Sequence, residues 1–202
     1  TGAGRTDAGV HALDQKAHFT FTAGLNQKKL CCSLNGLLPV DIRVLHSEEK
    51  EKKFHARYSC RSKIYHYHIN TTPFLLPFLR LYRYHYSPKL NPILLQAAAK
   101  TLVGSHDFRA FANENDRGSA ARKPVKNLKR LDILAEEYGL RLEFEADGFL
   151  YKMVRNLAGS LLAVAGGKMT LEELTALLKS GDRKKAGPAL PPQGLFLVKV
   201  NY

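Results

Sequence analysis

The 202-residue sequence lacks the features that mark membrane-spanning and secreted proteins. No apolar run approaches the ~18 residues that a transmembrane helix requires. The chain opens without methionine and without the apolar core of a signal peptide, so we expect a fragment of a longer protein. No lipidation motif or basic amphipathic anchor helix stands out. No membrane partner is therefore expected.

Cysteine is scarce and arranged in a way that disfavours disulfides. The three cysteines are Cys31, Cys32 and Cys60. An odd number and an adjacent pair favour a reducing compartment, so we expect a cytoplasmic protein. Neither C-x-x-C nor H-E-x-x-H occurs, and the eight histidines form no recognisable ligand set. No metal site is expected.

Acidic residues are also scarce. Lysine and arginine total 31 against 18 acidic residues, which gives a formal net charge of +13. Such a balance favours a polyanionic partner, and nucleic acid more than a membrane, although a merely basic soluble protein is the alternative. The candidate phosphate contacts are Lys28, Lys29, Arg61, Lys63, Arg117, Arg122, Lys123, Lys126 and the cluster Arg183, Lys184 and Lys185.

The first quarter of the chain predicts short elements. Polar and apolar residues alternate over residues 18–22, which indicates a strand with Phe19 and Phe21 on its buried face. A helix should follow and end before Pro39, and residues 42–45 indicate another short strand. The leucines at helical spacing are Leu30, Leu34 and Leu37.

The charged run at residues 48–53 is typical of a linker. We place a subdomain boundary there. Residues 1–54 would form an N-terminal subdomain, and residues 55–202 a C-terminal α+β subdomain.

The rest of the chain predicts a sheet with three helices. Helix signals are the cap pair Asn91-Pro92, a long apolar stripe over residues 149–165, and a capping box of Thr170 and Glu173 that opens a helix ending at Gly181. Strands and helices mix without strict βαβ alternation, which predicts an α+β fold on a largely antiparallel sheet. The expected strands cover residues 63–70, 81–86, 128–134, 140–145 and 194–202. The expected stripe is Leu150, Val154, Leu157 and Leu161, and the last strand should bury Leu195, Leu197 and Val198.

The most unusual segment is the glycine-rich start, TGAGRTDAGVHA. Its glycines permit close backbone approaches, and it places Arg5 and Asp7 in one small-residue loop. A phosphate-binding loop is excluded, because G-x-G-x-x-G would need glycine where Asp7 stands and no G-K-[ST] follows. From these residues alone, Asp7 and Arg5 could equally be functional or brace a turn.

Four segments resemble one known family. The run G-A-G-R-T-D-A-G-V-H-A resembles the active-site signature of the TruA family of tRNA pseudouridine synthases. F-H-A-R followed by K-I-Y-H-Y, then G-S-H-D-F, then F-L-Y-K-M-V-R-N, resemble its later segments in the same order. The C-terminal residues 194–202 are also similar, so the resemblance spans the chain. Two departures are an N-terminal stretch that family members carry before the signature, and L-P-P-Q in place of A-P-A-x-G near the end.

The resemblance implies a fold and an activity. The fold would comprise two ferredoxin-like-derived α/β subdomains that share a largely antiparallel central sheet. Helices would cover one side, the active-site cleft would lie between the subdomains, and the N-terminal strand region would be missing. The activity would be isomerisation of uridine to pseudouridine at positions 38–40 of the tRNA anticodon arm, without a cofactor and in a homodimer.

The resemblance also implies catalytic roles. Asp7 would be the essential carboxylate, either as a nucleophile at C1′ or by promoting elimination to a glycal. Arg155 would be its cationic partner, whereas the helix pattern alone favours a solvated surface arginine. Tyr65 would stack on the flipped uracil and handle the C5 proton, the alternative being a core tyrosine such as Tyr67.

Further residues would bind the substrate. Arg5 would occupy the space of the flipped nucleotide or contact a phosphate, unless it pairs with Asp7. His106 would contact RNA or form a structural hydrogen bond with Asp107. The remaining candidates in the loop are Thr6, Gly9 and His11. A catalytically silent RNA-binding module on the same fold is the competing hypothesis, which the intact Asp7, Tyr65 and Arg155 disfavour.

Overall fold

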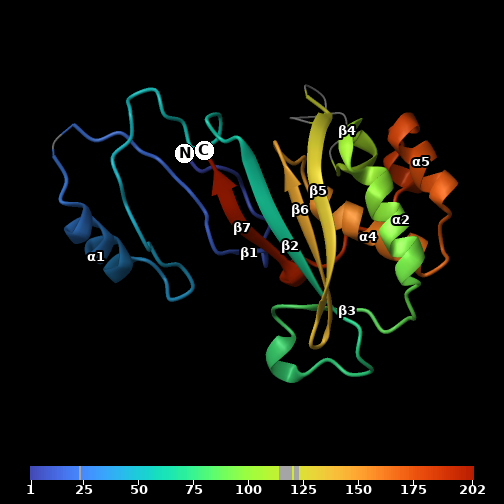
Figure 1. Cartoon of the computed structure of the whole chain (residues 1–202). Helices are drawn as coiled ribbons and strands as arrows, with labels where there is room; N and C mark the ends of the chain where they lie inside the picture. Colours follow the sequence, from blue (N-terminus) through green and yellow to red (C-terminus); the bar gives the residue numbers. More distant parts are fainter. Residues whose placement is uncertain (23, 114–119, 121–122) are drawn as a thin grey trace.

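A single mixed sheet organises the protein. The computed structural model describes residues 1–22, 24–113, 120 and 123–202 (Figure 1). The sheet order is β1-β7-β2-β6-β5-β4, with β3 beside β2. Pairs within β7-β2-β6-β5-β4 are antiparallel, whereas β1 and β3 run parallel to β7 and β2. The α+β expectation is confirmed. The strands are β1 His11–Ala12, β2 Ser62–Asn70, β3 Tyr84–His85, β4 Gly104–Asp107, β5 Val125–Glu136, β6 Gly139–Ala146 and β7 Leu195–Asn201.

Three helices pack together on one face of this sheet. Helix α2 contacts β5, α4 contacts β2, and α2, α4 and α5 contact one another, whereas α1 lies apart beyond the β1 edge (Figure 1). None of the helices in the described part of the chain is long and apolar enough to cross a membrane. The helices are α1 Gln27–Leu37, α2 Pro92–Leu102, α4 Met153–Ala165 and α5 Leu171–Ser180, with short 3-10 turns η1 Pro77–Leu79, η2 Arg109–Phe111, η3 Arg183–Lys185 and η4 Pro192–Gly194.

The expected helix caps are confirmed. Asn91 accepts hydrogen bonds from the backbone N–H groups of Ile93 and Leu94 at the start of α2. Thr170 and Glu173 form the reciprocal capping box of α5, which ends at Gly181 in a left-handed conformation. Each side-chain cap contributes about 1 kcal/mol because it satisfies an N–H group that has no partner inside the helix.

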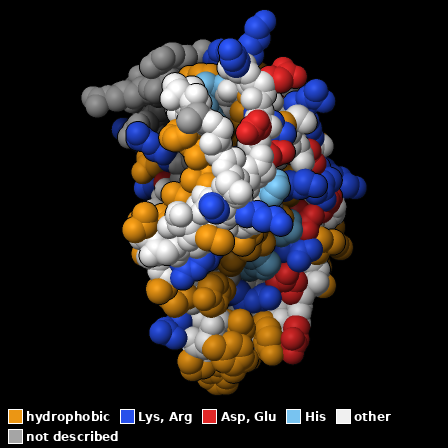
Figure 2. All heavy atoms as spheres, turned by 90° about the vertical axis from the view of Figure 1, so that its left-hand side faces the viewer, with side chains coloured by type: hydrophobic (Ala, Val, Ile, Leu, Met, Phe, Trp, Pro, Cys, Tyr) orange, Lys and Arg blue, Asp and Glu red, His pale blue; other side chains and the backbone are white. Residues whose placement is uncertain are grey.

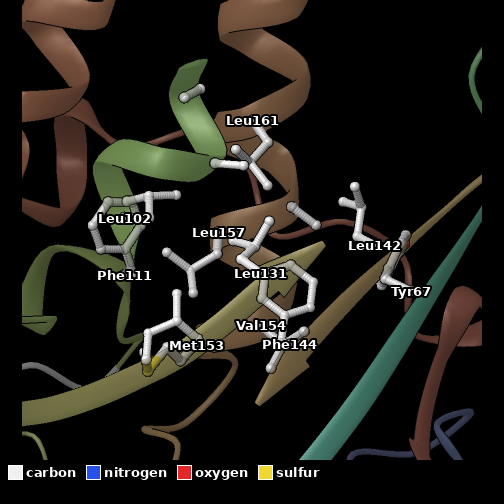
Figure 3. Packing of buried hydrophobic residues seen from close by; sticks show 14 of the residues in the cluster. Tyr67, Leu102, Phe111, Leu131, Leu142, Phe144, Met153, Val154, Leu157 and Leu161 are labelled. Atoms are coloured by element: carbon white, nitrogen blue, oxygen red, sulfur yellow. The ribbon is translucent and has the colours of Figure 1, made fainter. Parts of the chain in front are cut away.

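Helix α4 is the centre of the core. Its leucines meet the inward side chains of the strands, so that Leu157 lies near Leu131 and Phe144 (Figure 3). The expected stripe is buried, but the helix begins at Met153, because Lys152 adopts a left-handed φ of 58°. All residues from Met153 to Leu162 are buried, so α4 has no solvent-facing side in its first two turns.

Two expected strands in the first quarter of the chain are wrong. Residues 18–22 form no strand, and Phe19 and Phe21 are 62% and 56% exposed. Backbone pairing with the N-terminal segment stops at His18, whose N–H bonds the Thr1 carbonyl. Residues 42–45 form no strand either, because the side chain of Asn35 takes the place of a neighbouring strand by bonding both the N–H and the carbonyl of Val44.

Two later expectations need smaller corrections. Of residues 81–86 only Tyr84–His85 form a strand, because turns at Tyr82 and Arg83 bond back to Leu79. In β7 the buried valine is Val200, not Val198. The register between β2 and β7 shifts at this point, so the inward face passes from Leu197 to Val200.

Candidate active site

Asp7 and Arg155 form an ion pair. Arg155 Nη1 donates to Asp7 Oδ2 over 2.5 Å, and the two side chains are 11% and 22% exposed. Asp7 lies in the loop before β1, and Arg155 lies in the first turn of α4. The structure therefore excludes both a solvated surface role for Arg155 and the alternative in which Arg5 is the partner of Asp7.

The segment after η3 fixes the orientation of Arg155. Its Nε donates to the carbonyl of Leu190 over 2.5 Å, and the Leu190 N–H returns a bond to the Arg155 carbonyl over 3.2 Å. The hydroxyl of Tyr67 donates to the next carbonyl, that of Pro191, over 2.6 Å. The L-P-P-Q departure therefore lies in direct contact with the ion pair.

This segment approaches α4 closely because of a glycine. A Cβ on Gly159 would lie 1.9 Å from the carbonyl oxygen of Pro188. Only glycine permits that distance, so Gly159 allows residues 187–190 to pass directly over the helix. The guanidinium of Arg155 then lies between this segment and the Asp7 loop.

Ala3 anchors the loop that carries Asp7. Ala3 is fully buried in a small second core with Ala56, Leu197 and Val200. The Ala3 N–H donates to the backbone carbonyl of Lys16 over 2.7 Å, and Lys63 Nζ donates to the Ala3 carbonyl over 2.7 Å. Burial lowers the pKa of Lys63. Lys63 is thus a support of the loop and not a surface cation.

A turn from Asp7 to Val10, with Gly9 in a left-handed conformation, ends the loop on its other side. The N–H of Val10 donates to the backbone carbonyl of Asp7 over 3.1 Å. Gly9 has a φ of +82°, and a Cβ there would lie 3.1 Å from Pro192 Cγ. Substitution at Gly9 would therefore strain the backbone and crowd η4.

Tyr65 lies on β2 between the two cores. It pairs with Phe144 of β6 and Leu197 of β7, and its ring meets Phe149 edge-on at 5.0 Å. Burial, with smaller contributions from Cys60 and the charge of Asp7, raises the pKa of Tyr65 to about 12. Tyr65 is therefore a neutral phenol at pH 7. Tyr67 is fully buried, as expected of a core residue.

The loop candidates for substrate binding differ in exposure. Arg5 and Thr6 are exposed beside Asp7, which leaves both accessible to a ligand. His11 is held by the protein itself, because its Nε2 lies 2.6 Å from the Leu81 carbonyl and its ring stacks on Phe196 at 4.5 Å. The role of each in substrate binding stays a prediction.

His106 lies apart from the ion pair. It belongs to β4, which is separated from β2 by β6 and β5, or about 14 Å at the usual strand spacing. Its Nε2 lies 3.1 Å from the Val103 carbonyl, while Asp107 pairs with Arg109 at 2.6 Å. The structure does not join His106 to Asp107 or to Tyr65.

Asn156 is a buried residue of the site for which sequence reasoning assigned no role. Its Nδ2 donates to the Phe111 carbonyl and to Asn113 Oδ1, and its Oδ1 accepts from Arg183 Nη2 over 2.8 Å. Arg183 is therefore a brace between α4 and η3, and burial lowers its pKa. The motif M-V-R-N was the only signal that singled out Asn156.

The remaining cations contribute to a basic surface. Figure 2 shows lysine and arginine side chains spread over one face of the molecule, with acidic side chains gathered toward one side. Arg117 and Arg122 lie outside the described residues. The described portions contain no group of three His, Cys, Asp or Glu side chains placed to hold a metal ion. The phosphate-contact candidates that are exposed are Lys28, Lys29, Arg61, Lys123, Lys184 and Lys185.

Comparison with known proteins identifies the family of this chain. Residues 98–202 match a family model described as tRNA pseudouridine synthase. The chain is 50% identical over 201 residues to tRNA pseudouridine synthase A 1 of Protochlamydia amoebophila (strain UWE25), covering 100% of this chain and 78% of the relative. It is 43% identical over 201 residues to tRNA pseudouridine synthase A of Thermoanaerobacter sp. (strain X514), covering 100% of this chain and 81% of that protein. The chain belongs to the tRNA pseudouridine synthase A family.

Proposed function

We propose that this protein isomerises uridine to pseudouridine in tRNA, with Asp7 as the essential carboxylate. The observation that carries the proposal is the ion pair of Asp7 and Arg155, which is largely withdrawn from water and braced on both sides. A carboxylate needs compensation by a cation to remain charged in such a place. The guanidinium of Arg155 supplies that charge and holds the carboxylate in one orientation.

The reaction breaks the N1–C1′ bond, turns the uracil and forms a C5–C1′ bond. In one route Asp7 attacks C1′, uracil departs with the N1 electron pair, and C5 then displaces the carboxylate. In the other route Asp7 removes the C2′ proton and uracil leaves to give a glycal. C5 then adds to C1′ while C2′ regains its proton. In both routes C5 finally loses its proton and N1 gains one, so atoms balance without a cofactor.

The substrate base must leave the RNA stack to reach Asp7. Arg5 and Thr6 are exposed next to the carboxylate, and we assign Arg5 to the space that the flipped nucleotide vacates or to a phosphate. The ring of Tyr65 offers a surface on which uracil can stack. We propose the anticodon arm as the region of tRNA that is modified, as the family resemblance implies.

Other parts of the proposal concern the whole protein. We propose the homodimer and the two-subdomain organisation, at residues 1–54 and 55–202, on the resemblance alone. The three cysteines are free thiols, which supports the proposed cytoplasmic location. The basic face supports binding to a polyanion, so affinity for RNA should fall steeply with salt.

The test is the isosteric substitution Asp7→Asn. We expect it to abolish pseudouridine formation in an anticodon stem-loop RNA while the dissociation constant for that RNA stays close to wild type. Asp107→Asn is the matched control, because Asp107 also pairs with an arginine but lies on β4. Turnover by the Asp7→Asn protein would contradict the proposal. Tight RNA binding without turnover by the wild type would favour the silent RNA-binding module.

A further inference from the structure

A group of aromatic rings next to the catalytic loop takes no part in the proposed chemistry. The rings of His18 and His55 lie 4.7 Å apart, and those of His55 and Tyr58 lie 4.3 Å apart at 32°. We call these three residues the aromatic platform. Tyr58 ends the row with its side chain 78% exposed, so one aromatic surface of the platform faces solvent.

The two imidazoles of the platform are held in place by backbone hydrogen bonds. Nδ1 of His55 accepts the backbone N–H groups of Arg57 and Tyr58 over 3.1 and 3.2 Å. Nδ1 of His18 accepts the N–H of Ala56 over 3.1 Å. These backbone donors fix the orientation of both rings.

Packing and hydrogen bonds with neighbouring residues hold the aromatic platform in place. Phe54 packs against Tyr202 at a ring distance of 4.9 Å, and the Tyr202 hydroxyl donates to the Ala56 carbonyl over 2.8 Å. Ala56 is fully buried beside Ala3 in the small second core. An exposed tyrosine on a rigid support loses little conformational entropy when a ligand stacks on it.

The segment that carries His55 and Tyr58 is rich in cations. The segment KKFHARYSCRSK, residues 52–63, contains no carboxylate. Its cations other than Lys63 are exposed, and none of them makes an ion pair within the described part of the chain. They are Lys52, Lys53, Arg57 and Arg61. Cations beside an exposed aromatic ring form the combination that binds single-stranded nucleic acid.

The platform adjoins the loop that carries Asp7. The backbone of His18 exchanges hydrogen bonds with Thr1 over 2.8 and 2.9 Å. The segment that holds His18 therefore lies beside the start of the catalytic loop, at the distance of a paired strand.

We propose that the aromatic platform is a binding site for an unpaired nucleotide of the RNA substrate, whose base stacks on Tyr58. Arg57 and Arg61 meet the flanking phosphates. The inference rests on the proposed function in so far as the ligand is RNA. It adds a contact that holds a base other than the reacting uridine.

The test compares Tyr58→Ala with Tyr58→Phe. We expect Tyr58→Ala to raise the dissociation constant for a fluorescent anticodon stem-loop RNA by about 5- to 150-fold, the usual loss for one base–aromatic stack. Tyr58→Phe should bind like wild type because it keeps the ring. The single-turnover rate of Tyr58→Ala at saturating RNA should match wild type. The salt dependence should also be unchanged, whereas Arg57→Met should lower its slope by about one.

The outcomes separate this inference from the proposed function. If Tyr58→Ala binds RNA as tightly as wild type and the wild-type enzyme is active, the binding site at the platform is contradicted but the proposed function is not. Binding that depends on Tyr58 without turnover by the wild type supports the platform and contradicts the proposed function. Absence of RNA binding by the wild type contradicts both. A loss of self-association in Tyr58→Ala, seen by sedimentation, would make the ring a protein contact and overturn the RNA site.

Discussion

Lys63 Nζ lies 2.7 Å from the carbonyl oxygen of Ala3, four residues before Asp7. This half-buried ammonium connects strand β2, which also carries Tyr65, to the start of the catalytic loop. A Cβ on Gly4 would lie 3.2 Å from the same Nζ, so the loop packs closely against it. Lys63 therefore couples the position of the loop to the sheet.

We predict that Lys63→Met slows pseudouridine formation by about 10- to 100-fold, because a carboxylate displaced by about 1 Å loses the geometry of attack. The unpaired Ala3 carbonyl should also lower the free energy of unfolding by about 1–3 kcal/mol. Single-turnover kinetics at saturating RNA and urea unfolding measure the two effects.

Lys63→Arg is the conservative control and should restore part of the rate, since it keeps a donor near Ala3. A different result would revive a role for Lys63 in phosphate binding. In that case Lys63→Met would weaken RNA affinity and reduce its salt dependence while the rate at saturation stayed unchanged.

The ion pair of Asp7 and Arg155 should show strong energetic coupling. Arg155→Met leaves the charge of Asp7 in a site where its side chain is 22% exposed, so we expect a loss of about 2 kcal/mol in unfolding free energy. Adding Asp7→Asn to Arg155→Met should recover much of that loss. Urea unfolding of the wild type, the two single variants and the double variant gives the coupling energy. Effects that add within about 0.5 kcal/mol would contradict an energetic interaction between Asp7 and Arg155.

Local signals in the sequence were sufficient where the stabilising contacts are local. The caps at Asn91 and Thr170 act within three residues of themselves, and the alternation in β5 and β6 follows from one buried face. Residues 18–22 alternate equally well but lack a paired strand beyond His18. Periodicity predicts which face a strand would bury, but it does not show that a partner strand is present.

The site could be predicted only in part for a related reason. Helical periodicity is a local signal, and it placed Arg155 on a polar face of its helix. Because Arg155 and Asp7 are 148 residues apart, only the family motif linked the two residues. The carbonyl of Leu190 that orients Arg155 has no sequence signal, because every residue carries one. Lys63 has the sequence pattern of a surface cation, but the fold half-buries it against the Ala3 carbonyl.

Gly159 should be intolerant of any side chain. Gly159→Ala places a methyl group 1.9 Å from the Pro188 carbonyl, so we predict a loss of about 3 kcal/mol in unfolding free energy. Activity should fall as well, because the same segment presents the Leu190 carbonyl to Arg155. Urea unfolding and turnover measure both effects.

Gly36→Ala is the matched control for Gly159. Gly36 lies in helix α1, and nothing surrounds the position of its missing Cβ within 4 Å. We expect the alanine there to stabilise the protein by up to about 1 kcal/mol through helix propensity. Equal effects of the two substitutions would show that the contact at Pro188 is not tight.

Ionisation of Tyr65 should lower the stability of the folded protein at alkaline pH. Burial raises its pKa from the ordinary 10.0 of tyrosine to about 12, so the folded protein keeps the phenolic proton where the unfolded chain loses it. Stability from this group is complete below pH 10 and is lost as the pH rises toward 12, by up to about 1.4 kcal/mol per pH unit. Tyr65→Phe should therefore show a shallower alkaline loss in urea unfolding.

The same phenol should leave no inflection in the pH–rate profile between about pH 6 and 9, because it stays protonated throughout that range. Tyr65→Phe should have a profile of the same shape as wild type, whatever its absolute rate. A wild-type rate that climbs with pH, together with loss of that climb in Tyr65→Phe, would show instead that the phenolate is the reactive form. The phenolate oxygen would then accept the C5 proton, and Tyr65 would not serve only as a stacking surface.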